Sequence, residues 1–315
     1  MKNNKHISEI IKIFQNNDDL YTAHNLSKEV MKKIIYDKDC LHKIIEHNLL
    51  QPGFFNKKRH YPTMTLNVYK NALIDIVINI YPELPSGSTK DISFQSIHHH
   101  GNLLLSTIAL SGPGYSSIIF EKKFFVRDKD KSYKMETHEN YQNELGKYTF
   151  CDAHQPHVIF YPKKISSTFA LWSKNKKSRF DTIKAFIPNK FKKNLSALLI
   201  KFDLKEKMKI NIPENFDYYV ENNLIFSMKD RIHYPIGSND NFIQNIFYYF
   251  ESVNYNNFEF LKILIKKQFI NEVAKKWIRK YLDREHMFPK FEDIHLNIDK
   301  RVNISKESIE NVLKN

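Results

Sequence analysis

The 315-residue sequence contains only seven glycines and two cysteines. Neither glycine-rich phosphate pattern, G-x-G-x-x-G or G-x-x-x-x-G-K-[ST], occurs, which argues against P-loop ATPases and Rossmann dinucleotide-binding proteins. Cys40 and Cys151 cannot build a disulfide framework and form no Cys-x-x-Cys metal pair. No apolar run approaches the roughly 18 residues of a membrane span, and the chain starts without a signal-peptide pattern. These absences predict a cytoplasmic protein without a membrane anchor.

The positive charge of the chain is concentrated in one window. The net charge is +14, and residues 163–210 hold fourteen Lys or Arg against three acidic residues. Most basic residues are Lys, and the chain is also rich in Asn and Ile. A coding sequence rich in A and T would therefore explain the excess of positive charge equally well as an anionic partner. Nucleic-acid binding by this window therefore stays open as an alternative.

Hydrophobic periodicity divides the chain into three regions. Residues 1–60 show a helical pattern, with Asn25 or Ser27 as a candidate cap of the second helix. Residues 61–175 contain short β-branched and aromatic runs separated by turn residues, which is typical of an antiparallel sandwich or barrel. Residues 176–315 are basic and mostly helical, with Ser238 as an N-cap, a long helix over 258–283 and a short helix from Ser305. The predicted fold class is α+β.

Histidines gather in the strand-rich region. His98, His99 and His100 are consecutive, and His154 and His157 follow 54 and 57 residues after His100. On a strand, residues i and i+2 share a face, so His98 and His100 can offer two imidazoles to one point. A third imidazole from a neighbouring strand would complete a facial set of metal ligands. His-His-His also fits a polar turn, and three histidines suit zinc as well as iron.

At these residues the segment resembles a cupin. His98-x-His100-x4-Leu105-x6-Gly112 keeps the histidine pair, the spacing and the closing glycine of the first cupin motif, with Leu105 in place of its glutamate. Gly146-x10-His157 keeps the glycine and histidine of the second motif, and this match selects His157 over His154. The resemblance covers about a third of the chain and implies a jelly-roll β-barrel core with N-terminal and C-terminal helical additions.

Loss of the motif glutamate makes the segment similar to the three-histidine cupins, above all the cysteine and thiol dioxygenases. The resemblance implies Fe(II) held by His98, His100 and His157, with Zn or another divalent metal as the alternative, and O2 as co-substrate. The sequence departs from this group where a Ser-x-His-x-Tyr pattern closes the active site, because Ala170 and Trp172 stand there. Cysteine itself is therefore not the expected substrate.

Other residues near these motifs are candidates for the site. His154 and Asp152 are each expected as a proton shuttle or as an alternative metal ligand. As a ligand, Asp152 would form a two-His-one-carboxylate triad with two of the histidines. Candidates for substrate contact are Tyr161, Tyr115, Trp172 and Arg59, the last because it lies near the position of the carboxylate-binding arginine in the dioxygenase group. Core packing is the competing interpretation for each aromatic residue, and Cys151 is expected to be a small buried apolar residue.

The sequence therefore predicts a non-haem Fe(II) oxygenase that acts with O2 on a small anionic substrate. The substrate could be presented by an acidic carrier protein that docks on the basic window. The helical additions are expected to cover the mouth of the barrel or to form a homodimer interface. The alternative function is a cupin-like ligand sensor with a nucleic-acid-binding helical region, although the basic window lacks a recognisable helix-turn-helix.

Overall fold

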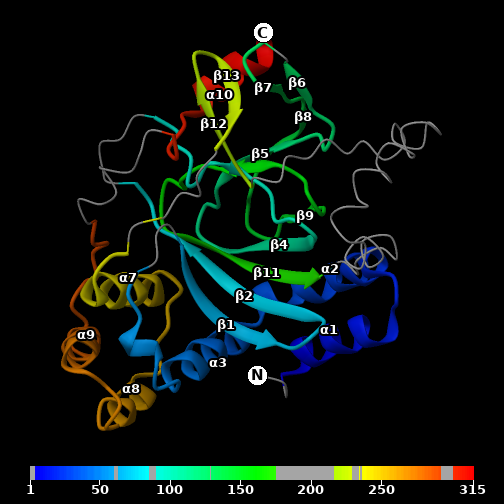
Figure 1. Ribbon diagram of the computed structural model, residues 1–315. Coiled ribbons are helices and arrows are strands. Elements are labelled where there is room, and N and C mark those ends of the chain that lie inside the picture. The colour runs from blue at the N-terminus through cyan, green and yellow to red at the C-terminus, as the bar shows by residue number, and fades with distance from the viewer. Residues whose placement is uncertain are drawn as a thin grey trace, which may run out of the picture.

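The computed structural model describes residues 4–59, 63–84, 90–127, 129–174, 216–228, 234, 236–291 and 301–315. Within them the strands form two antiparallel sheets that lie one over the other (Figure 1). The strands are β1 (Met64–Lys70), β2 (Ile74–Tyr81), β3 (Ile97–His98), β4 (Leu103–Ser111), β5 (Ser116–Phe120), β6 (Phe125–Arg127), β7 (Ser132–Lys134), β8 (Thr137–Gln142), β9 (Tyr148–Cys151), β10 (His157–Ile159), β11 (Ser166–Lys174), β12 (Asp217–Glu221) and β13 (Leu224–Ser227).

The chain crosses repeatedly from one sheet to the other. One sheet has the order β1-β2-β11-β4-β9, and the other has the order β6-β7-β13-β12-β3-β10-β5-β8. From β2 to β5, and again from β8 to β11, successive strands or strand pairs alternate between the sheets, which is the pattern of a jelly roll. The predicted α+β class with an antiparallel jelly-roll core is confirmed.

The five-stranded sheet uses its two faces differently. Along β2, Ile76, Ile78 and Ile80 are fully buried and join the core beneath the helices. Asn79 and Tyr81 alternate with them and point between the sheets, where they line a cavity. The alternation therefore gives this sheet one largely apolar face under the helices and one face of mixed polar and apolar side chains toward the cavity.

Three N-terminal helices cover the apolar face. They are α1 (Lys5–Asn16), α2 (Leu20–Tyr36) and α3 (Lys38–Leu49), and α2 contacts β4 while α3 contacts β1. The expected cap of the second helix is wrong, because Asp19 accepts hydrogen bonds from the backbone of Tyr21 and Thr22. Ser27 lies inside α2 and donates to the carbonyl of Ala23.

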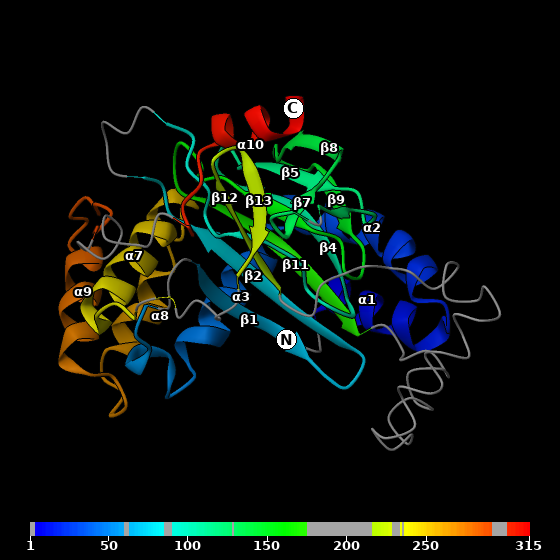
Figure 2. The same cartoon turned by 45° about the horizontal axis from the view of Figure 1, so that its top comes forward.

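C-terminal helices pack at one end of the same core (Figure 2). They are α7 (Asn239–Ser252), α8 (Phe258–Leu264) and α9 (Glu272–Leu282), and Ser238 caps α7 as predicted. The single long helix expected over 258–283 is wrong: the chain leaves α8 near Ile265 and begins α9 at the new cap Asn271. A last helix, α10 (Lys306–Lys314), begins at Ser305 as predicted and packs on the eight-stranded sheet through Ile309.

The larger sheet also uses chain from outside the expected 61–175 range. β12 pairs with β3, and β13 pairs with β12 and β7, although residues 176–315 were expected to be mostly helical. Most of the basic window, from residue 175 to 210, lies outside the described residues. None of the helices in the described part of the chain is long and apolar enough to cross a membrane.

Candidate metal centre

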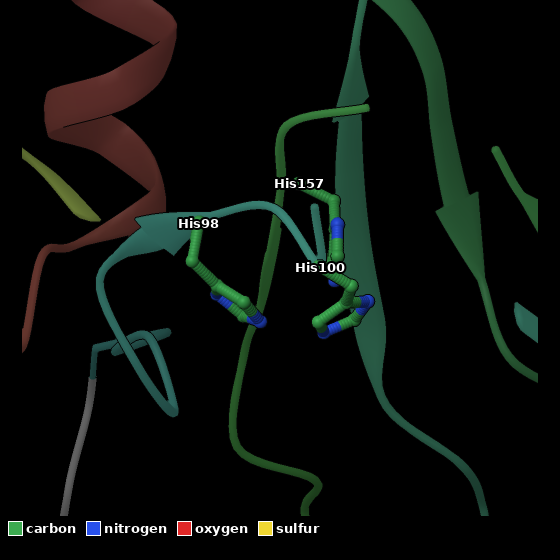
Figure 3. Close-up of side chains that lie close together, drawn as sticks. All are labelled: His98, His100 and His157. Atoms are coloured by element: carbon green, nitrogen blue, oxygen red, sulfur yellow. The ribbon is translucent and has the colours of Figure 1, made fainter. Parts of the chain in front are cut away.

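Three histidines converge between the two sheets. The antiparallel register of β3 and β10 places His157 opposite His98. β3 ends at His98, so the strand is shorter than the histidine pattern predicts, yet His100 in the following turn returns to the same side. The ring centroids of His98 and His100 lie 5.1 Å apart, and they lie 4.5 and 4.6 Å from that of His157. Figure 3 shows the three rings turned toward one another.

Backbone carbonyls fix the proton on two of these rings. His98 Nδ1 lies 2.9 Å from the carbonyl oxygen of Ser96, and His157 Nδ1 lies 3.1 Å from that of Gln155. A carbonyl only accepts, so each Nδ1 carries the hydrogen and each Nε2 keeps its lone pair. His157 Nε2 is buried and has no hydrogen-bond partner among the described residues, and the same holds for His100 Nδ1.

Burial keeps the three imidazoles neutral. It lowers the pKa of His157 to about 3, with help from the neighbouring His98, and it lowers the pKa of His100 well below the ordinary value. Burial also lowers the pKa of His98. Neutral imidazoles with free lone pairs are the protonation state that metal binding requires.

The donor set fits a divalent metal ion. One nitrogen from each of the three rings lies within 4.8 Å of the others. Nitrogens that share one ion lie about 3 to 3.5 Å apart at metal–nitrogen distances near 2.1 Å, so small ring rotations would suffice. Buried imidazole nitrogens without partners cost free energy, and a metal ion would satisfy them. The three-histidine group can therefore hold a metal ion.

The cavity around these rings has a volume of about 220 Å³ and two layers of inward-facing side chains. We call the first the histidine layer. It consists of His98, His157 and Ile119 on the eight-stranded sheet and Leu105, Cys151 and Trp172 on the five-stranded sheet. Cys151 Sγ lies 3.4 Å from His157 Nδ1, and the Trp172 ring lies 4.6 Å from the His100 ring, so the two halves of this layer meet.

The second layer, which we call the hydroxyl layer, lies two residues further along each strand. It consists of Ile159, Ser117 and Tyr141 on the eight-stranded sheet and Thr107 and Thr149 on the five-stranded sheet. Two residues of β-strand span about 7 Å. Beyond it, Tyr115 and Tyr81 also line the cavity, with ring centroids 4.8 Å apart.

The turn before Tyr115 depends on glycine. Gly112 and Gly114 have φ angles of +76° and +75°. A Cβ on Gly114 would lie 1.4 Å from the carbonyl oxygen of Asn143, so no other residue fits there. The backbone of Asn143 in turn donates to the carbonyl of Tyr115, and this contact anchors the start of β5 beside the cavity.

Some predicted site residues line the cavity and others do not. His98, His100, His157, Tyr115 and Trp172 line it. Tyr161 does not; its ring packs 4.5 Å from Phe94, which does. Tyr161 therefore supports the wall from behind.

Asp152 and His154, the alternative ligands, point elsewhere. The carboxylate of Asp152 accepts from Tyr21 and pairs with Lys122, and these partners hold its pKa below the usual range despite burial. His154 adopts a φ of +58°, and its Nε2 lies 2.6 Å from the side-chain oxygen of Asn102. Neither residue lines the cavity.

The expected substrate contact of Arg59 is wrong. Its guanidinium is buried away from the cavity and donates to the side chain of Asn241 in α7 and to the carbonyl of Lys290. Arg59 was expected at the cavity because it lies close in sequence to the strands that form it. The segment before β1, however, packs against the C-terminal helices. Arg59 joins these segments.

Sequence reasoning missed several lining residues. Tyr81, Tyr141, Thr107 and Thr149 were not among the candidates. The alternation of side chains along a strand could have identified them. Tyr81 and Thr107 lie next to Ile80 and Ile108, which are buried on the opposite face of the sheet, so they point to the inner face. Cys151 is buried as expected, and burial raises the pKa of its thiol to about 12.

No protein-family model matches the chain, and no curated protein matches its sequence. Solved structures match part of it. KdgF from Halomonas sp. is 10% identical over 38% of this chain and 88% of its own, with a TM-score of 0.27. DMSP lyase DddQ from Ruegeria pomeroyi DSS-3 is 11% identical over 38% of this chain and 49% of its own, with a TM-score of 0.25.

A cupin superfamily protein from Desulfitobacterium hafniense DCB-2 is 11% identical over 38% of this chain and 82% of its own, with a TM-score of 0.24. At such identities and TM-scores, these structures assign no activity to the chain. None of the three is named a thiol dioxygenase.

Proposed function

We propose that this protein is a non-haem Fe(II) oxygenase that binds iron through His98, His100 and His157 and uses O2 to oxidise a small anionic substrate. The observation that carries the proposal is a pair of buried imidazole nitrogens, His100 Nδ1 and His157 Nε2, which lie at a polar cavity and have no hydrogen-bond partner within the described ranges. A dioxygenation, in which both oxygen atoms enter the product, balances without any further reductant.

The iron would supply an undiminished 2+ charge and open coordination positions for the substrate anion and O2, because its three ligands are neutral. The carbonyls of Ser96 and Gln155 orient two of the ligands, and removal of such supporting contacts typically weakens metal binding. Leu105, Ile119 and Trp172 surround the site with apolar surface that limits access of water.

An open groove next to the cavity offers a route for the substrate. It has a volume of about 590 Å³ and shares His100 and Trp172 with the cavity. Lys174 and the ion pair between Lys70 and Asp75 line the groove, so its charged side chains leave a net positive charge from Lys174 that an approaching anion would pass. Trp172 stands where the groove meets the cavity and would control entry.

The test is metal analysis and O2 consumption of protein purified without a histidine tag. After anaerobic incubation with ferrous iron, we expect one equivalent of iron per chain in the wild type and none in His98→Ala or His100→Ala. O2 consumption with a panel of small thiols, carboxylic acids and enols is expected to require the bound iron.

His99→Ala is the matched control for both variants. His99 lies between the two ligands, but its ring faces away and packs against Phe216, and its Nδ1 accepts from the backbone of Gly101. It is expected to keep the iron. The proposal fails if ferrous iron does not bind the wild type, or if the His99 variant loses iron as completely as the other two.

A further inference from the structure

The cavity wall away from the histidines is rich in hydroxyl groups. Tyr115 and Tyr141 have ring centroids 6.4 Å apart, and Tyr115 also lies against Tyr81. Thr107 and Thr149 add two more hydroxyls from the facing sheet. We call Tyr81, Tyr115, Tyr141, Thr107 and Thr149 the hydroxyl cluster.

The cavity wall contains no carboxylate and no Lys or Arg among the described residues. Apart from the histidines, its side-chain polar groups are hydroxyls, one thiol, the indole N–H of Trp172 and the amides of Asn79 and Gln95. A second carboxylate or phosphate on a bound molecule would therefore be buried without a cation, which is costly. An uncharged polar group carries no such cost if it finds a hydrogen-bond partner.

Two hydroxyls of the hydroxyl cluster, those of Tyr141 and Thr149, are not fully satisfied by the described residues. The hydroxyls of Tyr141 and Thr149 are buried, and their interaction lowers the pKa of Tyr141, though by less than burial raises it. Neither, however, forms a hydrogen bond of good geometry with a described residue. Buried hydroxyls without partners are uncommon because each loses its hydrogen bonds to water without replacement. Their position two residues beyond the histidine layer places them about 7 Å along the strands from it.

The tyrosines of the cluster act as donors. Burial raises the pKa of Tyr141 to about 12 and raises the pKa of Tyr81 and Tyr115 above the ordinary value. All three phenols are therefore protonated at neutral pH, and each has one hydrogen to give. An oxygen atom of a ligand would be the complementary acceptor.

We propose that the hydroxyl cluster determines substrate specificity by binding an uncharged oxygen acceptor, such as a carbonyl, amide or hydroxyl, at the end of the substrate remote from the metal. The inference rests on the proposed function in one respect, that the anionic end binds a metal held by the three histidines. The substrate class is then a small molecule with one anionic, metal-binding end and one neutral, oxygen-bearing end.

The experiment compares two series of metal-binding probes on the zinc-loaded or cobalt-loaded full chain. One series is the monohydroxamates of succinic, glutaric and adipic acid, and the other is the same molecules with the free carboxylate replaced by a primary amide. The hydroxamate binds the metal in both series, so each pair differs only in the distal charge. Calorimetry or the visible spectrum of the cobalt protein gives the affinities.

For the probe length that binds most tightly, we expect the amide probe to bind at least about tenfold more tightly than the matching carboxylate probe. Tyr141→Phe and Tyr115→Phe are each expected to weaken amide binding about fivefold without changing the metal content. The matched control is Tyr218→Phe, since the buried hydroxyl of Tyr218 also has no hydrogen-bond partner among the described residues, but Tyr218 belongs to a different apolar cluster. It is expected to leave amide affinity unchanged.

The inference is overturned if the carboxylates bind as tightly as the amides, if neither series binds the metal-loaded protein, or if the two phenylalanine variants match the control. These outcomes differ from failure of the proposed function, which shows as absence of bound metal before any probe is added.

Discussion

Two buried histidine sites lie on opposite faces of the same two strands. On the outer face, Ser106 of β4 and Ser173 of β11 lie 2.7 and 2.8 Å from the two ring nitrogens of His24 in α2. On the inner face, one residue away, Leu105 and Trp172 belong to the histidine layer. Both sites are buried, and burial lowers the pKa in both, to about 4 for His24.

The difference lies in the unused hydrogen-bonding capacity. Both nitrogens of His24 have partners, and Tyr148 extends the network by a 2.7 Å hydrogen bond to Ser106. His157 and His100 each keep a buried nitrogen without a hydrogen-bond partner in the part of the chain that the structure describes. Burial and a lowered pKa are therefore common to both sites, and what sets the three-histidine group apart is the unsatisfied ring nitrogens beside a cavity among the described residues.

The largest expected effect separates the two sites by metal affinity. His157→Ala removes one of three ligands and is expected to weaken zinc binding by more than about 100-fold, since loss of a supporting contact alone typically costs 10- to 100-fold. Competition with a chromophoric chelator at pH 7.5 measures the affinity. Zinc affinity at the wild-type level in this variant would remove His157 from the site.

A substitution at the other histidine site, His24→Ala, is expected to lower the stability of the fold. His24→Ala leaves a cavity and deprives Ser106 and Ser173 of their partner, so we expect the free energy of unfolding to fall by about 2–4 kcal/mol. Zinc affinity should stay within about threefold of the wild type. Urea unfolding of the metal-free protein gives the first value, and the chelator assay gives the second. A loss of zinc binding comparable to that of His157→Ala would contradict the comparison.

The pH dependence of stability gives a third distinction. His24 has a folded-state pKa of about 4, below the value of 6.5 for an exposed imidazole, so the unfolded chain binds more protons between these values. Its contribution to stability is complete above pH 6.5 and is lost as the pH falls toward 4. We expect the stability difference between wild type and His24→Ala to shrink by about 3 kcal/mol over this range. Urea unfolding at a series of pH values measures it, and a constant difference would exclude this role.

The smallest expected effect concerns the alternative ligands. Asp152→Asn and His154→Ala are expected to keep one equivalent of zinc and an affinity within about threefold of the wild type, because neither side chain lines the cavity. Asp152 is instead held by Tyr21 and Lys122. The chelator assay decides; a tenfold loss in either variant would place that residue in the metal centre.

Local patterns predicted much of the fold. The segments that form β2, β4, β5 and β10 are rich in apolar and β-branched residues. Ser238 and Ser305 are good N-caps because each hydroxyl accepts a hydrogen bond from a backbone N–H of the first helical turn. The predictions failed where several local solutions were available. Asp19 caps α2 although Asn25 and Ser27 are equally suitable residue types, since only tertiary packing selects where a helix begins.

The incorrect predictions about contacts between distant segments had a similar cause. β12 and β13 pair with β3 and β7, which lie more than 80 residues earlier in the chain, and no local signal specifies that pairing. Arg59 is near the expected site in sequence, but it binds Asn241, 182 residues away. Such contacts depend on how distant segments meet.

The sequence by itself determined the candidate ligands and the alternation that gives each strand two different faces, because both depend on neighbours one or two residues apart. The spacing of His98, His100, Gly112, Gly146 and His157 carried the resemblance to the cupin motifs, and that resemblance predicted the three-histidine group. The tertiary structure decided which nitrogens remain without partners and that the described cavity wall carries hydroxyls instead of an arginine. Those properties arise where β3 meets β10 and where the two sheets face each other, so they depend on contacts that no local pattern encodes.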